Sequence, residues 1–346
     1  MTRPALTVLV VFLLTAATAV AVRTAAPAAA AGQAARDLLE SFDAAERAEI
    51  VLDYADDSRT GWHFIPKDDR KGLPLSEMTE PQREATMGLV RTLLSQVGEE
   101  KVTGAMRLEG LVAELEGEGR RWPRDPALYY LTMFGQPAEF GEAGRRWGIS
   151  FEGHHVSLNF VLEGDRVVDS TPQFLGAHPA VVKNENATGY EIGFRLLRDE
   201  EQIGFDLLAS LDDDQRAKAI ISQTAPKEVL SAAQPSPLAG APKGLPASEM
   251  TETQRELLAE LIDAYLEIVA DPLAEARAER FDDESPEEQF FAWAGGDRPG
   301  QPHYYRIETP SLEIELANTQ PDAMGNPANH LHAMLRDNRG DFGLDE

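Results

Sequence analysis

Apolar residues recur every three or four positions in residues 89–97 and 257–266, which is the period of a helix with one buried face. Upstream of each stretch, a threonine is followed three residues later by a glutamine. This pairing satisfies free amides in the first turn of a helix. The same spacing with aspartate as the cap occurs twice more. The predicted helix starts are Thr79 with Gln82, Thr251 with Gln254, Asp43 with Glu46, and Asp212 with Gln215.

After these helices, both halves of the chain change to alternating apolar and polar residues separated by Gly, Asp and Pro. Such alternation predicts antiparallel strands that are buried on one face. Helices followed by an antiparallel meander, twice over, predict an α+β fold. The strands are expected at 147–151, 156–162 and 166–170 in the first half and at 304–308, 311–316 and 330–335 in the second.

Two pairs of segments repeat along the chain. Residues 71–84 and 243–256 are identical at 12 of 14 positions with an offset of 172, and residues 38–48 and 207–217 at six of 11 with an offset of 169. A repeat of this length indicates a tandem duplication. The shared KGLPxSEMTE motif is best interpreted as a loop and a helix start, with a binding loop as the alternative.

The duplication predicts a first copy at residues 36–190 and a second at 200–346, packed as one compact body. The copies would face each other about a pseudo-twofold axis or share one sheet, and the sequence does not decide between these arrangements. Features present in only one copy are where function is expected to have been added.

The N-terminus resembles a secretory signal peptide. Arg3 is followed by an apolar run from Ala5 to Val22 and then by small residues. This order predicts a signal peptide at residues 1–31 and a secreted or periplasmic protein. The alternative is an uncleaved membrane anchor, because the run just reaches the length that spans a bilayer.

Composition excludes several classes of site. The chain has no cysteine, which rules out disulfides, thiolate metal sites and a cysteine nucleophile. Its net charge of −27 argues against binding to nucleic acid or to anionic lipid. There is no phosphate-binding loop and no dinucleotide fingerprint, so no nucleotide cofactor is expected. A serine hydrolase using Ser157 or Ser170 has no local motif in its favour.

Four of the seven histidines form two pairs in predicted strand regions: His154 with His155, and His330 with His332. In a strand His330 and His332 would point the same way, and His155 would share the polar face of its own strand with Asn159. Neither pair has a counterpart in the other half. The pairs were therefore gained or kept asymmetrically.

A strand-borne His-x-His pair with a distant histidine is a common way to hold zinc, copper or iron, because imidazole nitrogen suits these ions. His155, His330 and His332 would supply three ligands, with His154 as a further candidate ligand and Glu152 nearby. The alternative is that these histidines only form hydrogen bonds at strand and turn positions.

The run from Phe151 to Phe160, with Thr171-Pro172, the segment 174–177, Asn329-His330-Leu331-His332 and the C-terminal Asp341-Phe342-Gly343, resembles the family called domain of unknown function 3500. The resemblance covers almost all of the chain from about residue 36. Because the family has no established activity, the resemblance implies a shared site around these histidines and says nothing about a reaction. The residues that match its motifs are His154, His155, Asn159, Asn329, His330 and His332.

Two functions are therefore considered. In the first, the protein binds a transition metal, and Asn159, Asn329 and Glu152 orient the ligands or a bound water; a metal-dependent enzyme would be one form of it. In the second, it is an extracellular module that binds a small molecule without metal. The second hypothesis predicts a cleft between the copies lined by Trp62, Trp147 and Tyr304.

Overall fold

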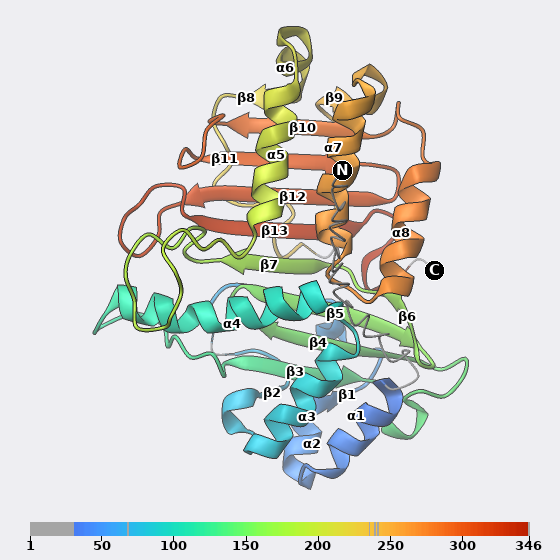
Figure 1. Cartoon of the computed structure of the whole chain (residues 1–346). Helices are drawn as coiled ribbons and strands as arrows, with labels where there is room; N and C mark the ends of the chain where they lie inside the picture. The colour runs from blue at the N-terminus through green and yellow to red at the C-terminus, as the bar shows by residue number, and fades with distance from the viewer. Residues whose placement is uncertain (1–30, 68, 235, 239, 241, 345–346) are drawn as a thin grey trace, which may run out of the picture.

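The computed structural model describes residues 31–67, 69–234, 236–238, 240 and 242–344. The predicted signal peptide lies outside these ranges apart from its last residue. Within them, no helix is long and apolar enough to cross a membrane. The described residues form a mixed α/β fold with eight α-helices and one large sheet (Figure 1).

The first half supplies four helices and seven strands. They are α1 (Ala31–Glu40), α2 (Ala44–Ile50), β1 (Val51–Leu52), β2 (Leu73–Pro74), α3 (Glu80–Arg91), α4 (Gln96–Glu116), β3 (Tyr129–Phe134), β4 (Arg146–Gly153), β5 (Val156–Glu163), β6 (Arg166–Asp169) and β7 (Gln173–Ala177).

The second half supplies four helices and six strands. They are α5 (Arg198–Ser210), α6 (Asp213–Ala219), β8 (Ile220–Ser222), β9 (Leu245–Pro246), α7 (Glu252–Leu266), α8 (Asp271–Asp283), β10 (Phe290–Gly295), β11 (His303–Glu308), β12 (Leu312–Gln320) and β13 (His330–Asp337).

The strands of both halves belong to one sheet. Its order is β1-β3-β4-β5-β7-β13-β12-β11-β10-β8, with β2, β6 and β9 paired beside this path. The halves meet where β7 pairs antiparallel with β13. Of the two arrangements that the sequence left open, the structure has the shared sheet. It also contains two short parallel pairs, β1 with β3 and β8 with β10, which alternation did not predict.

Strands β3, β7 and β10 were not expected from the sequence. Each is buried along most or all of its length. A strand covered on both faces has no need for polar residues at alternate positions, so it lacks the alternating pattern. The strands predicted from alternation coincide with β4, β5, β6, β11, β12 and β13 to within a few residues.

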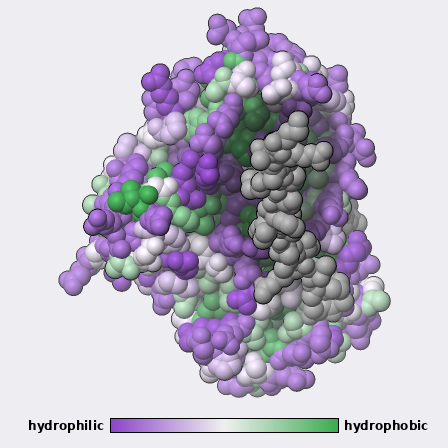
Figure 2. Space-filling view, viewed as in Figure 1, coloured by the Kyte–Doolittle hydropathy of each residue, from purple (hydrophilic) through white to green (hydrophobic). Residues whose placement is uncertain are grey.

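Helices α4, α5, α7 and α8 lie across one face of the sheet (Figure 1). Under the helices lies the larger hydrophobic core, which includes Leu331 and Leu335 of β13. The exposed side chains of this helical face are mostly hydrophilic, as expected for a chain of net charge −27 (Figure 2).

A smaller core lies on the opposite face of the sheet, because alternate residues of a strand point to opposite sides. It contains Met334 of β13, Phe174 of β7, and Trp62 and Phe64 from the segment between β1 and β2. The rings of Phe64 and Phe174 stack with centroids 3.9 Å apart. The connecting segment is therefore part of the packed structure and covers this face of the sheet.

All four predicted capping boxes are present. The glutamines of the repeated motif have a second role. Gln82 donates to the carbonyl of Ser41 at the end of α1 (2.9 Å), and Gln254 donates to that of Ser210 at the end of α5 (2.8 Å). Each motif thus starts one helix and holds the end of another, which agrees with its interpretation as scaffold.

Candidate metal centre

The first histidine pair forms the tight turn between β4 and β5. His155 has a φ of +65°, a backbone conformation that residues other than glycine rarely adopt. Contacts with the surrounding structure must therefore hold this residue in place. Its amide donates to the carbonyl of Phe64 (3.0 Å), and its carbonyl accepts from the amide of Gly176 (2.8 Å). The Tyr129 hydroxyl binds the carbonyl of His154 (2.7 Å). The turn is therefore anchored from three sides.

The second pair lies on β13, where His332 stands directly opposite Gly176 of β7. A side chain cannot be added at Gly176 without conflict, because a Cβ atom there would lie 2.6 Å from the ring of His155. The glycine leaves the space into which the His155 ring packs. This packing brings the turn of the first half onto the strand of the second half.

Three imidazole nitrogens converge at this place. The Nε2 atom of His155 lies 2.7 Å from that of His330 and 3.2 Å from that of His332, and the last two are 3.1 Å apart. Nitrogen ligands at about 2.05 Å in a tetrahedral site would be about 3.3 Å apart. The triangle is thus close to the size that a bound transition metal needs. His154, which stacks on His155 at 3.7 Å, offers a fourth nitrogen within 4.8 Å of those of His155 and His330.

Two carboxylates fix the orientation of the rings. Nδ1 of His332 lies 2.6 Å from Glu228, and Nδ1 of His154 lies 2.5 Å from Glu109 of α4. At His154 the Arg124 guanidinium, which can only donate, also lies 3.0 Å from Nδ1 and competes with Glu109 for that atom. At His332 the carboxylate of Glu228 accepts from Nδ1, which in a neutral imidazole leaves the lone pair on Nε2. This is how carboxylates commonly orient metal-binding histidines.

Hydrogen bonds alone cannot satisfy the triangle. Each of the three Nε2 atoms carries either a proton or a lone pair, so at least two of them must be alike. Two N–H groups or two lone pairs therefore face each other at 2.7 to 3.2 Å in every arrangement of protons. A cation between the rings would satisfy all three nitrogens at once.

His154, His155 and His330 are neutral near pH 7. Burial, followed by the neighbouring histidines, holds the pKa of His155 and that of His330 well below the ordinary value. Burial also lowers the pKa of His154, against the opposing effect of Glu109. Neutral imidazole is the form that binds metal.

His178, which follows β7, belongs to the cluster although the sequence did not single it out. Its ring stacks on that of His330 with centroids 4.2 Å apart. Burial is the main cause that lowers its pKa to about 3. Its Nε2 accepts from the amide of Ala323, while its buried Nδ1 has no partner. The stacking holds the His330 ring in position.

The other predicted site residues bind elsewhere. Glu152 is paired with Lys71 (3.0 Å) and Arg70 (3.7 Å). The Asn159 amide donates to the carbonyl of Pro172 (2.9 Å). Asn329 holds the backbone of Val181 through both its oxygen (2.8 Å) and its nitrogen (3.0 Å). Asn329 therefore ties the segment after β7 to the start of β13 and supports the site through the backbone.

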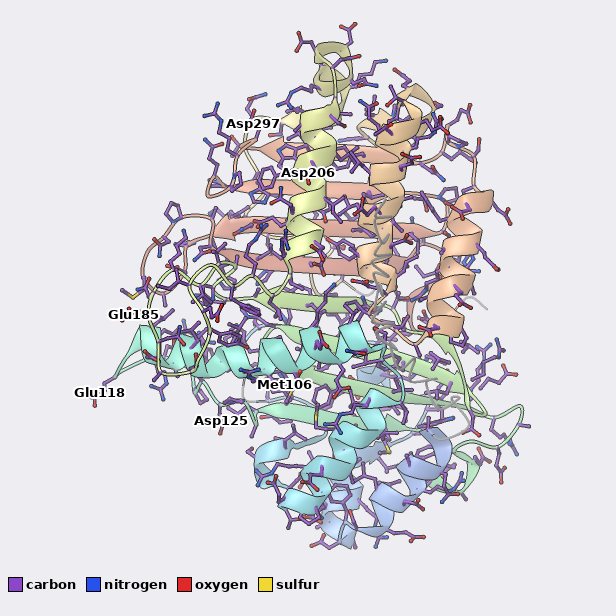
Figure 3. All side chains as sticks on the ribbon, viewed as in Figure 1. Met106, Glu118, Asp125, Glu185, Asp206 and Asp297 are labelled. Carbon is purple, nitrogen blue, oxygen red and sulfur yellow. The ribbon has the colours of Figure 1, made fainter. Side chains whose placement is uncertain are left out.

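The segments around the site gather at one end of the sheet. Glu118 and Asp125, in the segment joining α4 to β3, lie at the same side of the molecule as Glu185 in the segment after β7 (Figure 3). The amide of Ala187 binds Glu114 of α4, which joins the second of these segments to the helix (2.9 Å). From the first, Arg124 pairs with Glu116 of α4 (2.7 Å) and lies 3.0 Å from Nδ1 of His154.

The aromatic residues expected to line a cleft between the copies do not do so. Trp62, Trp147 and Tyr304 are each buried in the hydrophobic cores. The indole of Trp147 donates to the carbonyl of Gly164 (2.7 Å). That part of the ligand-binding hypothesis is wrong, because these side chains fill the interior.

Comparison with known proteins gives one match. The sequence model of a family described as "Protein of unknown function (DUF3500)" matches residues 24–344. The chain belongs to this family, as its histidine motifs indicated. Neither the curated proteins nor the solved structures contain a match.

Proposed function

We propose that this member of the DUF3500 family binds a divalent transition metal ion through the Nε2 atoms of His155, His330 and His332. The observation that carries the proposal is the triangle of nitrogens, 2.7 to 3.2 Å on a side, in which every arrangement of protons leaves two like groups facing each other. Zinc, copper and iron(II) suit three imidazoles, and the absence of cysteine leaves nitrogen and oxygen as ligands.

Three protein nitrogens leave one coordination position for water or a substrate. In zinc enzymes this arrangement lowers the pKa of the bound water and makes it a nucleophile at neutral pH. His154 would border such an ion, and its Nδ1 atom lies 2.5 Å from Glu109. We infer that the site is catalytic in type, and that Glu228 and Glu109 set the orientation of the rings.

The supporting architecture is consistent with a duplicated unit arranged about a pseudo-twofold axis. Reciprocal contacts suggest it: the amide of Ser95 binds the carbonyl of Ile268 (3.1 Å), and that of Ala270 binds the carbonyl of Leu93 (3.2 Å). On this hypothesis the axis passes between the two halves at the β7–β13 pair. The proposed metal would lie off this axis, since the histidines are found at one end of the β7–β13 pair.

Metal analysis of the purified protein tests the proposal. After loading with Zn²⁺, Cu²⁺ or Fe²⁺ and desalting, we expect about one ion per chain, and none in His330→Ala or His332→Ala. His63→Ala is the matched control, because His63 hydrogen-bonds only within its own loop. His154→Ala should keep the ion. No stoichiometric metal in the wild type, or equal content in wild type and His330→Ala, would overturn the proposal.

A further inference from the structure

A small cavity lies beside the histidine cluster and reaches His154. Its volume is about 110 Å³, and its wall includes Glu109, Trp122, Tyr129 and Tyr130. Glu109 and His154 form the buried polar side of this cavity, while the aromatic rings and neighbouring prolines form the apolar side. A pocket with apolar walls and a few convergent polar groups is the usual form of a small-molecule site.

The volume sets the size of the occupant. An enclosed apolar cavity of about 150 Å³ binds benzene, and one water takes about 30 Å³ of liquid. The cavity here is smaller than the first and larger than the second, so it admits part of a six-membered ring, with the polar end of the molecule at the mouth. Flat aromatic walls favour a planar ring over a branched aliphatic group of the same volume.

One cation at the cavity is available to a ligand. The Arg70 guanidinium is committed to the carbonyls of His63 and Gly153. Among the described residues, Lys67 pairs with Asp69, whose side chain is 80% exposed. Such surface pairs contribute about 0–1 kcal/mol, so Lys67 can exchange this partner for an anionic ligand at little cost.

We propose that the cavity binds a small aromatic carboxylate. Its ring lies among Trp122, Tyr129 and Tyr130, its carboxylate binds Lys67, and the far edge of the ring faces His154. A catalytic role for this pocket rests on the proposed metal site, because His154 would lie between the cavity and the ion. Binding itself requires only the residues of the cavity.

Benzoate is the probe, with benzamide as its neutral counterpart, titrated into the full chain and followed by calorimetry and ligand-observed NMR. Both the zinc-loaded and the metal-free protein are measured. We expect benzoate to bind more tightly than benzamide. Lys67→Met should weaken benzoate about tenfold or more, as for loss of a hydrogen bond to a charged group, and leave benzamide unchanged. Trp122→Ala should weaken both, and Lys227→Met, which does not line the cavity, should weaken neither.

The inference falls if wild-type protein binds no benzoate, if benzamide binds equally well, or if Lys67→Met leaves benzoate affinity unchanged. These outcomes are separate from failure of the metal proposal. Benzoate binding in a protein that takes up no metal would leave the pocket standing and remove the metal chemistry. Metal uptake without benzoate binding would leave the metal site standing and remove the proposed pocket.

Discussion

The hairpins β4–β5 and β11–β12 occupy corresponding places in the two halves but differ in what holds their turns. Both make the same backbone contact with the next strand: the amide of Gly176 binds the carbonyl of His155 (2.8 Å), and that of Asn338 binds the carbonyl of Ser311 (2.9 Å). The second turn is closed by its own side chain, since Thr309 Oγ1 accepts from the amide of Leu312 (2.9 Å).

The first turn relies on neighbouring segments, namely Phe64 and Tyr129. Because its own side chains are not needed to close the turn, His154 and His155 are free to face the cluster. The comparison shows that two similar hairpins are closed in different ways. In the first hairpin, neighbouring segments hold the turn, and its two histidine side chains face the site.

Exchanging the residues at these corresponding positions should have the largest effect. His155→Ser puts into the first turn the residue found in the second, and we expect metal binding to be lost because one of three ligands is removed. Ser311→Ala should retain the full metal content. Stoichiometry by elemental analysis, with circular dichroism to confirm folding, measures both. Retention of stoichiometric metal by folded His155→Ser would contradict the assignment of His155 as a ligand.

Removing the negative charge behind a ligand should have a smaller effect. Glu228→Gln keeps the shape of the side chain but no longer provides a charged acceptor for Nδ1 of His332. Loss of such partners typically weakens metal affinity 10–100-fold. Competition with a chromophoric chelator measures the change. Glu249→Gln, on an exposed ion pair with Lys218, is the control; equal affinities for the two variants would show that Glu228 does not support the ligand.

The repeated glutamines test the scaffold that the halves share. Gln82→Ala and Gln254→Ala each remove a capping contact and a bond to the end of α1 or of α5, so each should cost about 1–3 kcal/mol of unfolding free energy. Gln254 also exchanges hydrogen bonds with Gln215, so its loss should cost slightly more. Urea denaturation gives both values. A change in metal content on either replacement would show that the motif takes part in the site.

The smallest expected effect is a pH dependence of the metal-free protein. The folded state keeps the pKa of His155 well below about 6.5, the ordinary value that holds in the unfolded chain. At a pH between the folded-state pKa and the unfolded-state pKa, only the unfolded chain takes up the proton. This contribution to stability is present above pH 6.5 and is lost as the pH falls. The stability difference between wild type and His155→Ser should shrink by about 1.4 kcal/mol from pH 7.5 to pH 5.5.

Taking the difference removes the opposite contribution of Asp169. Burial raises the pKa of that carboxyl to about 6, so the folded state gains stability relative to the unfolded state as the pH falls below 6. Both proteins contain Asp169, and its contribution cancels. Denaturation curves at the two pH values measure the result, and a difference that stays constant would show that His155 is not held neutral by its surroundings.

Sequence reasoning could predict the parts of the site that lie on strands with one polar face. Alternation placed His330 with His332 on one face of β13, because polar residues at every second position are visible in one dimension. His155, expected to share a strand face with Asn159, instead lies in the turn before β5. The helix starts were predictable for a similar reason, since a capping box is complete within four residues. Both signals, the capping boxes and the spacing of His330 and His332, lie within a few neighbouring residues, and both are present in the structure.

The rest depends on contacts between distant segments. Glu109 and Glu228 are two of 59 acidic residues, and nothing near them in the sequence distinguishes them. They become partners of His154 and His332 only after folding, across separations of 45 and 104 residues. His178 offered a weak signal as a histidine beside the Gly176-Ala177 motif. Strands β3 and β10 were missed because burial on both faces removes the alternation.

The seam between β7 and β13 has a mechanical consequence. His155 comes from the first half, and His330 and His332 from the second, so an ion held by all three would act as a cross-link between the halves. Neither half could unfold alone without releasing it. A ligand that binds only the folded state stabilises it by about 2.7 kcal/mol when present at 100 times its Kd. The metal-loaded protein should therefore melt in one cooperative transition, even if the two halves unfold separately without the ion.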